Sequence, residues 1–487
     1  MSFLDPATWT GKIYSGGWVE GSGGTYQAVE PATGQALGTV GAASAADVHP
    51  AAERAAEAQR EWAGLTYDRR AAVLRRAGDL FVEHEEEIQD WLVRESGAIR
   101  PFAQFQTRAV AAEECWEAAA LASAPYGELL RSNQQRLSLS RRLPVGVVGV
   151  IAPFNAPVIL AVRAIAPALA LGNAVICKPD PRTAVCGGIV FARILAEAGL
   201  PEGLFHLLPG GADGGTARVE DPLVRVIAFT GSTRAGRAVA AAAAQHLKRV
   251  HLELGGNSAL VVLDDVDIEQ AASVGAFGSF NHAGQICMAT SRHLVAASVA
   301  QDYAAALAEH AERIPVGDPT RPDVGMGPII DARQRDHVHD LVTASVAAGA
   351  RLDAGGTYEG LFYRPTVLSQ VPLTAPAYAE EIFGPVAPVV PFGSLDEAVA
   401  LAGGTAYGLS LGLLTRDVMR GLALAERIPS GLVHINDQTV NDEALVPFGG
   451  VGESGTGSRH GGSAANLEAF TEVQWVTMRG DLPRYPF

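Results

Sequence analysis

The side chain with the widest chemical repertoire in this sequence is Cys287, which lies in the stretch NHAGQICMAT. A thiol can pack in a core, bind a metal, form a disulfide or, as a thiolate, attack a carbonyl carbon. The other cysteines are Cys115, Cys177 and Cys186, and no pair of the four has the C-x-x-C spacing of a dithiol or zinc motif. We therefore predict no metal site, and core packing and nucleophilic attack remain as interpretations of Cys287.

Two other polar side chains have the chemistry that would assist a nucleophile. Glu253 lies between leucines in HLELGGN, and a carboxylate in apolar surroundings has a raised pKa that suits a general base. Asn155 ends a predicted strand in VIAPFNAP, where its amide can donate to a developing oxyanion. The alternatives are a strand-edge glutamate paired with a lysine or arginine, and an asparagine in an ordinary turn between prolines.

Two further segments have residues that could bind a phosphorylated ligand. Lys178 ends the apolar run in ICKPDPRTAV, and the carboxyl end of a parallel strand is where open α/β sheets bind ligands. In VIAFTGSTRAG, Gly231 permits a tight turn and Ser232 can cap a helix whose N-terminus receives a phosphate. A solvent-facing lysine and a plain strand–turn–helix connection are the alternatives, because this segment lacks the G-x-G-x-x-G fingerprint.

The elements that must position these residues follow from the hydrophobic pattern. Residues 44–97 have apolar positions every three or four residues and predict helices, with Ser44 as a cap and Gly97 as a stop. From residue 144 onward, continuous apolar runs alternate with helical stretches. The predicted helices there are 157–171, 183–199, 233–248 and 395–402, and the predicted strands include PVGVVGVIAP, NAVICKP, FHLLPG, VRVIAFTG, PVAPVVPF, GLSLGLLT and GLVHIN.

This alternation predicts parallel, doubly wound α/β sheets. A second alternating region begins at SALVVLDDVD and runs to about residue 440, so we expect two α/β domains with a boundary near HLELGGN. Residues 132–145 predict an exposed pair of strands, and the C-terminal FTEVQWVTM also alternates. Either segment could pair with a neighbouring subunit.

The composition excludes several classes of protein. Of the 487 residues, 48% are hydrophobic and 18% are charged, which is typical of a globular protein. The net charge of −16 argues against a nucleic-acid partner or an anionic membrane surface. No signal peptide is predicted at the N-terminus, and prolines and polar residues interrupt the longest apolar stretch, so we predict no membrane helix. Few, scattered cysteines favour a cytoplasmic location.

Taken together, the motifs resemble those of the NAD(P)-dependent aldehyde dehydrogenase superfamily. PFN, KP, FTGS, LELGG, GQIC, EEIFGPV and PFGG occur in the family order, over roughly residues 30–475. Within the family, the segments NQQRLSLSRRLPVGVVGVIAPFNAPV and GQICMATSRHLV are most similar to the benzaldehyde and vanillin dehydrogenases. The resemblance implies a Rossmann-like cofactor domain (1–124 and 145–252), an α/β catalytic domain (253–455) and a small β arm for oligomerisation (125–144 and 456–487).

The resemblance also implies roles for the motif residues. Cys287 attacks the aldehyde carbonyl, and the Asn155 amide with the Cys287 backbone N–H holds the oxyanion of the thiohemiacetal. Hydride transfer to the nicotinamide then leaves a thioester, which water activated by Glu253 hydrolyses; Glu253 is also a candidate base for the Cys287 thiol. The presence of Glu253 favours hydrolysis of the thioester over acyl transfer to coenzyme A. The implied cofactor contacts are Pro153, Phe154, Lys178, Gly231, Ser232, Glu381 and Phe383, with Lys178 and Glu381 at the ribose hydroxyls, Ser232 at the pyrophosphate and Phe383 at the nicotinamide.

One departure from the family pattern concerns the choice of cofactor. Many NAD-preferring relatives have a glutamate three residues after the strand-end lysine, whereas this chain has Pro181 there, between Asp180 and Arg182. The missing acid removes a repulsion against a 2′-phosphate, although Asp180 could substitute for it. We therefore expect NAD to be favoured, with NADP possible.

Other departures concern the substrate. The expected pocket residues are Ala156, Arg163, Ile286 and Phe448, and Ala156 replaces an aromatic residue of many relatives, which leaves space for a planar ring. For Arg163 we consider two interpretations. It could form a surface salt bridge, or it could donate a hydrogen bond to a ring hydroxyl or carbonyl of the substrate, because a buried guanidinium needs acceptors. His282 is expected to be a structural polar residue rather than a second base.

The predicted function is oxidation of an aromatic aldehyde, of the benzaldehyde, vanillin or hydroxybenzaldehyde type, to the carboxylic acid with NAD(P)⁺. The predicted partners are this small molecule and further copies of the chain in a homodimer or homotetramer. The alternatives are an aliphatic or semialdehyde dehydrogenase, a non-catalytic crystallin-like protein, and an acyl-transferring or thioesterase enzyme. The presence of Cys287, Glu253 and Asn155 together argues against a non-catalytic protein.

Overall fold

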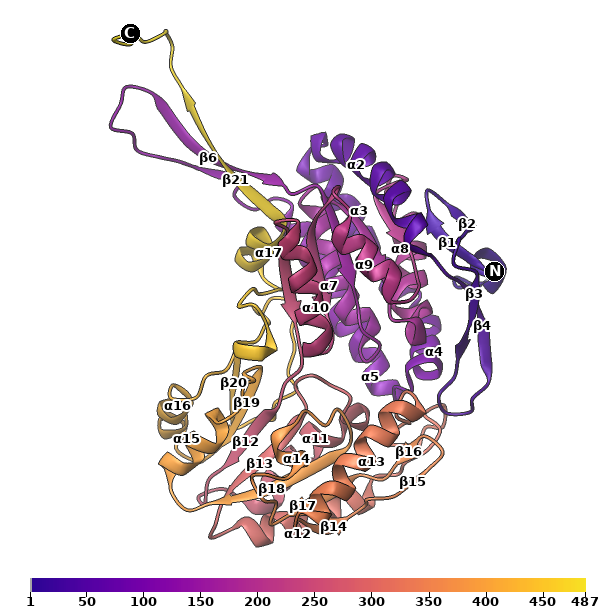
Figure 1. Ribbon diagram of the computed structural model, residues 1–487, viewed down its shortest axis with the longest axis vertical. Coiled ribbons are helices and arrows are strands. Elements are labelled where there is room, and N and C mark those ends of the chain that lie inside the picture. Colours follow the sequence, from indigo (N-terminus) through magenta and orange to yellow (C-terminus); the bar gives the residue numbers. More distant parts are fainter. Residues whose placement is uncertain (1) are drawn as a thin grey trace.

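A computed structural model describes residues 2–487 of the chain. Two large sheets, each with helices packed against it, form the two main bodies, and a narrow β arm projects from the first of them (Figure 1). The predicted α/β class, with two strand–helix regions and a small β arm, is confirmed.

The first large sheet has seven strands in the order β11-β10-β7-β8-β9-β1-β2. The strands from β11 to β9 are parallel, and β1 and β2 add an antiparallel edge. Most residues of these parallel strands are buried, as a sheet covered on both faces requires. Their bounds are β7 Val147–Ile151, β8 Ala174–Lys178, β9 Phe205–Leu207, β10 Val224–Thr230 and β11 Arg249–Glu253, and those of the edge are β1 Lys12–Ser15 and β2 Trp18–Glu20.

The helical region predicted at 44–97 is confirmed as a short 3-10 turn followed by three α-helices. Ser44 caps the turn by accepting from the Ala46 N–H, while the Asp47 carboxylate accepts from the Ser44 N–H. Gly97 ends the last helix with a φ of 73°, where glycine is favoured. The helices of this body include α2 Val48–Gly64, α3 Tyr67–Glu83, α4 Glu85–Ser96, α6 Glu113–Leu121, α7 Pro157–Ala170, α9 Ala212–Glu220 and α10 Thr233–Gln245.

The prediction of a single helix at 183–199 is wrong in detail. A 3-10 turn (Pro181–Thr183) and a π-helical turn (Val185–Ile189) precede α8 (Val190–Glu197). The segment contains Gly188, where an added Cβ would lie 2.4 Å from Leu207 Cδ1, so the chain approaches β9 too closely for a side chain. The Glu95 carboxylate accepts from two backbone N–H groups at the start of the π turn.

The second large sheet also has seven strands, in the order β14-β17-β18-β13-β12-β19-β20. It begins after β11, so the predicted boundary near HLELGGN coincides with the passage of the chain from one sheet to the other. Its strands are β12 Ser258–Val262, β13 Thr290–Ala296, β14 Arg351–Ala354, β17 Thr366–Ser369, β18 Val386–Phe392, β19 Ser410–Leu414 and β20 Leu432–Ile435. Its helices include α11 Ile268–Phe280, α12 Ala300–Arg313, α13 Ala332–Ala347, α15 Leu395–Gly403 and α16 Val418–Ala425.

The arm is a three-stranded sheet in the order β21-β6-β5. Residues 132–145 do not form the predicted pair of strands: they supply the single strand β6 (Leu137–Pro144), which pairs with β5 (Gly127–Leu129) and β21 (Thr471–Met478). The two alternating segments therefore pair with each other within one chain. Figure 1 shows β6 and β21 extending together from the body, with the C-terminus at the tip.

Among residues 2–487, no helix combines the length and the hydropathy that crossing a membrane requires. The apolar stretch after residue 144 divides into β7 and α7, and α7 has only 14 residues.

Candidate active site

Cys287 follows a tight turn between α11 and β13. His282, Ala283 and Gly284 have successive φ values of 49°, 54° and 65°, which is unusual for residues with a Cβ. An added Cβ at Gly284 would lie 2.1 Å from the Gly384 carbonyl oxygen, so only glycine fits there. Of the four cysteines, all of which lie in the described part of the chain, Cys287 alone is partly exposed.

Gln285 holds this turn in place from within the protein. Its side-chain oxygen accepts from the Ile330 N–H at 2.9 Å, and its amide nitrogen donates to the Pro328 carbonyl at 3.4 Å. The Gln285 side chain is fully buried. The turn that presents Cys287 is therefore fixed by a neighbouring loop of the second domain.

Asn155 lies in the loop between β7 and α7, next to the residue that caps α7, and is 3% exposed. Together with Cys287 it lines two cavities that meet at this point of the structure. The N-terminus of α7 adds a favourable dipole for negative charge near the same place. An oxyanion formed on a carbon bound to Cys287 can receive a hydrogen bond from this amide.

His282 lies behind Asn155, where it has a structural position. Burial lowers the pKa of His282 to about 4, although a hydrogen bond with the Asn155 backbone acts in the opposite direction. Its ring packs against Phe102 with the ring centroids 4.8 Å apart. A neutral, packed imidazole supports the expectation that His282 is not a second base.

The larger of the two cavities has a volume of about 420 Å³ and lies between the two large sheets. Residues from both domains line it. Every residue predicted to contact the cofactor is present in its wall: Pro153, Phe154, Lys178, Gly231, Ser232, Glu381 and Phe383.

The wall of this cavity fits a dinucleotide. Ser232 caps α10, whose 13 residues place the positive end of a helix dipole at the cavity. An added Cβ at Gly231 would lie 2.6 Å from the Phe229 ring, so any larger residue there would displace that ring. Burial lowers the pKa of Lys178, whose Nζ donates to only one acceptor among residues 2–487, the Pro179 carbonyl at 3.5 Å. Its ammonium thus keeps donors for ribose hydroxyls.

Glu381 lines the same cavity as the helix-capping turn. One of its oxygens accepts from the Gly256 N–H at 3.0 Å, and burial raises the pKa of Glu381 to about 7. An added Cβ at Gly255 would lie 2.1 Å from the other oxygen, so glycine is needed for the carboxylate to fit. That oxygen is available to accept from a hydroxyl.

Asp180 and Arg182 form an ion pair beside Pro181 at the same cavity. The Arg182 Nε and Nη2 each donate to an Asp180 oxygen at 2.8 Å, and Nη1 donates to Asp331 at 2.7 Å. The guanidinium also stacks on the Phe154 ring, 4.1 Å from its centroid. The acidic group that could substitute for the missing glutamate is therefore neutralised by its neighbour.

The smaller cavity, with a volume of about 40 Å³, opens from Cys287 on the other side. All four residues predicted for the substrate pocket line it. The complete wall is Phe102, Phe105, Asn155, Ala156, Ile159, Leu160, Arg163, Ile286, Cys287, Met288, Val440, Asp442 and Phe448. Phe102, Phe105 and Asp442 were not found from the sequence, because no motif surrounds them and helical periodicity alone does not show which face meets Cys287.

Arg163 does not form the surface salt bridge that was one of its two interpretations. It is 5% exposed, because α7 is buried on almost every face. Its guanidinium pairs with Asp442 and lies 3.8 Å from a Glu114 oxygen. It also lies over the Phe448 ring, with the guanidinium carbon 4.3 Å from the centroid. The wall of the smaller cavity thus contains a buried cation and its carboxylate partner.

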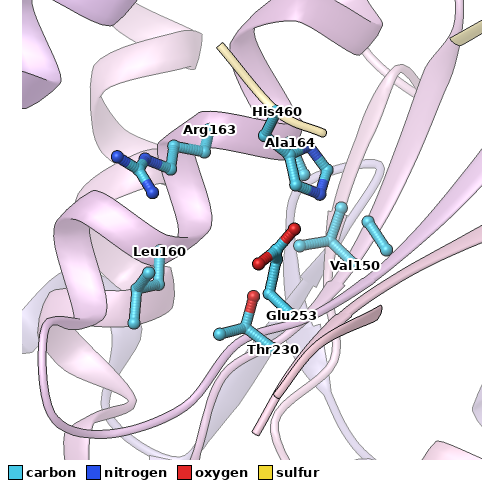
Figure 2. A pocket seen from close by; sticks show the side chains of 8 residues that line it. Val150, Leu160, Arg163, Ala164, Thr230, Glu253 and His460 are labelled. Carbon is cyan, nitrogen blue, oxygen red and sulfur yellow. The ribbon is translucent and has the colours of Figure 1, made fainter. Parts of the chain in front are cut away.

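Glu253 ends β11 and is 4% exposed. Neither of its carboxylate oxygens has a hydrogen-bond partner among residues 2–487, so the strand-edge ion pair is not formed. Burial raises the pKa of Glu253 well above its ordinary value, against smaller effects of Arg163 and Arg459. Glu253 lines neither cavity that contains Cys287; its carboxylate lies in a separate small cavity (Figure 2).

The Cys287 thiol is protonated at neutral pH in this arrangement. Burial, followed by the negative charges of Glu381 and Glu253, raises the pKa of Cys287 to about 12, while Arg163 acts in the opposite direction. A thiolate at this position therefore needs a base or an additional positive charge.

Comparison with known proteins identifies the family. Residues 18–476 match the model of the aldehyde dehydrogenase family, and the chain belongs to that family. It is 63% identical, over the whole of both chains, to a vanillin dehydrogenase of an Amycolatopsis species. It is 48% identical, over 98% of both chains, to a benzaldehyde dehydrogenase [NAD(+)] of Pseudomonas putida.

Solved structures agree with this assignment. The crystal structure of a salicylaldehyde dehydrogenase from Pseudomonas putida G7, complexed with salicylaldehyde, matches with a TM-score of 0.94 and 35% sequence identity. The match covers 98% of this chain and 99% of that one. The resemblance inferred from the ordered motifs, and the aldehyde dehydrogenase fold it implied, are confirmed.

Proposed function

We propose that this chain oxidises aromatic aldehydes to carboxylic acids, with NAD as the hydride acceptor. The observation that carries the proposal is the position of Cys287, where a cavity suited to a dinucleotide meets a smaller cavity walled by aromatic and aliphatic side chains. The relatives named for vanillin, benzaldehyde and salicylaldehyde support the aromatic class, and the Pseudomonas putida relative named for NAD(+) supports the cofactor.

In the first step, the Cys287 sulfur bonds to the aldehyde carbon and the carbonyl π electrons move to the oxygen. The Asn155 amide and the Cys287 N–H donate to that oxyanion, which stabilises the thiohemiacetal. When bound, NAD accepts the hydride that leaves the carbon. The carbon remains bound to Cys287 as a thioester, and the planar ring of the substrate occupies the smaller cavity beside Ala156 and Phe448.

In the second step, Glu253 acts as the general base. Water attacks the acyl carbon, one proton passes to the carboxylate, the carbon–sulfur bond breaks and Cys287 keeps the electron pair. Since Glu253 lines a cavity separate from those of Cys287, its side chain turns toward the thioester in this step. The same carboxylate is the base within the site that can take the proton of the Cys287 thiol.

For cofactor binding, we propose that Lys178 and Glu381 hold ribose hydroxyls and that the N-terminus of α10, beginning at Ser232, receives the pyrophosphate. Phe383 packs near the nicotinamide. The pairing of Asp180 with Arg182 leaves little net repulsion toward a 2′-phosphate, so NADP is a second, poorer substrate.

We propose that the arm joins copies of the chain in a homodimer or homotetramer. Leu129, Val473 and Trp475 on its strands are 75%, 61% and 61% exposed, which is unusual for large apolar residues in a small sheet. A second copy would cover them. Light scattering at several protein concentrations would give a dimeric or tetrameric mass, whereas a monomeric mass at all concentrations would contradict this arrangement.

A panel of aldehydes tests the proposed function. We expect NADH to form with benzaldehyde and vanillin at a kcat/KM at least about tenfold above that for an aliphatic aldehyde or a semialdehyde, since one or two apolar contacts are worth this factor. Higher kcat/KM for the aliphatic aldehydes would contradict the substrate class. Hydrolysis of a thioester without NADH formation from any aldehyde would contradict the reaction.

A further inference from the structure

The small cavity around the Glu253 carboxylate has the size of one water molecule. It has about 10 Å³ of room for the centre of a water-sized sphere, close to what a single water needs. Figure 2 shows the carboxylate directed between Thr230 and the His460 ring, while the Arg163 guanidinium points away from it. The rest of the wall is apolar and consists of Val150, Leu160, Ala164 and Ala228.

Apart from Arg163, whose guanidinium pairs with Asp442, two residues in this wall have buried polar atoms without partners among residues 2–487. Both Glu253 oxygens and Nδ1 of His460 have no hydrogen-bond partner among residues 2–487. An unsatisfied buried polar group costs about 1–3 kcal/mol. Buried waters in proteins occupy sites of this kind and bond to such groups. The size of the cavity and its unpartnered atoms thus independently indicate an ordered water.

The His460 ring is held beside Glu253 by the surrounding chain. The His460 backbone exchanges two hydrogen bonds with Phe448, of 2.7 and 3.0 Å, and the side chain is 4% exposed. Its ring packs edge-on against His251, with 5.6 Å between the centroids. His251 is fixed in turn by a hydrogen bond to the Ala469 carbonyl.

The groups that face Glu253 come from several elements. Arg163 on α7 and Arg459 beside His460 lower its pKa, and its charge is also coupled to Cys287 across the site. Burial, together with His251 and Arg163, lowers the pKa of His460 to about 3. The imidazole is therefore neutral, with one nitrogen that donates and one that accepts.

We propose that His460 is a positioning residue that, through one buried water, gives the ionised Glu253 carboxylate a hydrogen-bond donor. The inference rests on the proposed role of Glu253 as the base for thioester hydrolysis. An apolar side chain at position 460 would leave the ionised carboxylate without that partner. The protonated form would then be favoured, and hydrolysis would slow at neutral pH.

The pKa of Glu253 in the free enzyme is the first readout. Its infrared carboxyl band is assigned as the band lost in E253Q, and its pH titration is compared in the wild type, H460L and H460N. We expect the midpoint in H460L to rise by about one pH unit, a tenfold change in the ionisation equilibrium. H460N keeps a polar atom close to the position of Nδ1 and should recover most of that change. Equal midpoints in all three proteins would overturn the inference.

Pre-steady-state kinetics separates this inference from the proposed function. With NAD and benzaldehyde, H460L should retain a burst of NADH, followed by a steady rate about tenfold below that of the wild type at neutral pH, in line with the shift of one unit. A retained burst with a wild-type steady rate would contradict the role of His460 alone. No NADH from the wild type would contradict the proposed function itself.

A crystal structure of the wild-type protein tests the water directly, independently of how the variants fold. Density for one water within hydrogen-bond distance of Glu253 and His460 is expected. A dry cavity in a map that shows other buried waters would overturn the inference.

Discussion

The guanidinium carbon of Arg163 lies 4.3 Å from the centroid of the Phe448 ring, and the same guanidinium pairs with Asp442. All three residues line the smaller cavity at Cys287. A wall of aromatic and aliphatic groups therefore contains one polar point, with donors on Arg163 and acceptors on Asp442. An aromatic ring that enters this cavity can place a hydroxyl group at that point.

We predict that Arg163→Ala lowers kcat/KM for a hydroxylated benzaldehyde about tenfold more than for benzaldehyde, because a lost hydrogen bond to a charged group costs about 1.5–3 kcal/mol. Steady-state assays of both substrates measure the ratio. The single variant also leaves Asp442 buried without its cation, so the double variant Arg163→Met/Asp442→Asn is the control for lost stability. Equal losses on both substrates would reject a role in substrate recognition.

For the oxyanion site, Asn155→Ala should lower kcat by about 10²–10³-fold, the usual effect of removing one oxyanion donor. The dissociation constant for NAD, measured by fluorescence quenching, should change little. Asn155→Asp is the matched control of similar volume, and its negative charge should reduce kcat at least as much. A loss in Asn155→Ala below tenfold would contradict the assignment.

The choice of cofactor should depend on Arg182. We expect the wild type to use both cofactors and to have a higher kcat/KM with NAD. Arg182→Ala removes the partner of Asp180, and the freed carboxylate should lower kcat/KM for NADP relative to NAD by about tenfold. Asp180→Asn should move the ratio in the opposite direction. A strong NADP preference of the wild type would contradict the expectation.

Stability should depend on pH through Glu114, whose pKa is raised by burial from 4.5 to about 7. A carboxyl group with a higher pKa in the folded state stabilises the fold below pH 4.5, and this contribution is lost as the pH rises through about 7. The Tm of Glu114→Gln should therefore rise relative to the wild type across that range. Exposed Glu113 on the same helix supplies the control Glu113→Gln, which removes a surface carboxylate instead of a buried one. A constant difference for Glu114→Gln would contradict the shift.

Much of the site could be predicted because its residues lie at ends of apolar strands, where sequence patterns are strongest. Lys178 ends β8, Glu253 ends β11 and Asn155 follows β7, so their placement at one sheet edge follows from parallel topology. The continuous apolar strands made the α/β class equally evident.

The remaining features depend on contacts between distant segments. The partner of Arg163 is Asp442, which lies in a loop of the second domain and has no distinguishing pattern. The alternating pattern at 132–145 indicated exposed strand structure. It could not indicate that the main partner of this segment is β21 of the same chain. In the same way, His460 lines the same small cavity as Glu253 only because a loop brings it there from near the C-terminus.

The most direct test of covalent catalysis by Cys287 is the mass of the peptide that contains this residue after a single turnover. E253Q mixed with NAD and benzaldehyde should form about one NADH per active site, more slowly than the wild type because Glu253 is also the proposed base for the Cys287 thiol, and then stall, because hydrolysis lacks its base. Mass spectrometry should find one benzoyl group on the peptide that contains Cys287, and none in a Cys287→Ala protein. NADH formation by Cys287→Ala, or an unmodified Cys287 in E253Q after the NADH has formed, would contradict covalent catalysis by this residue.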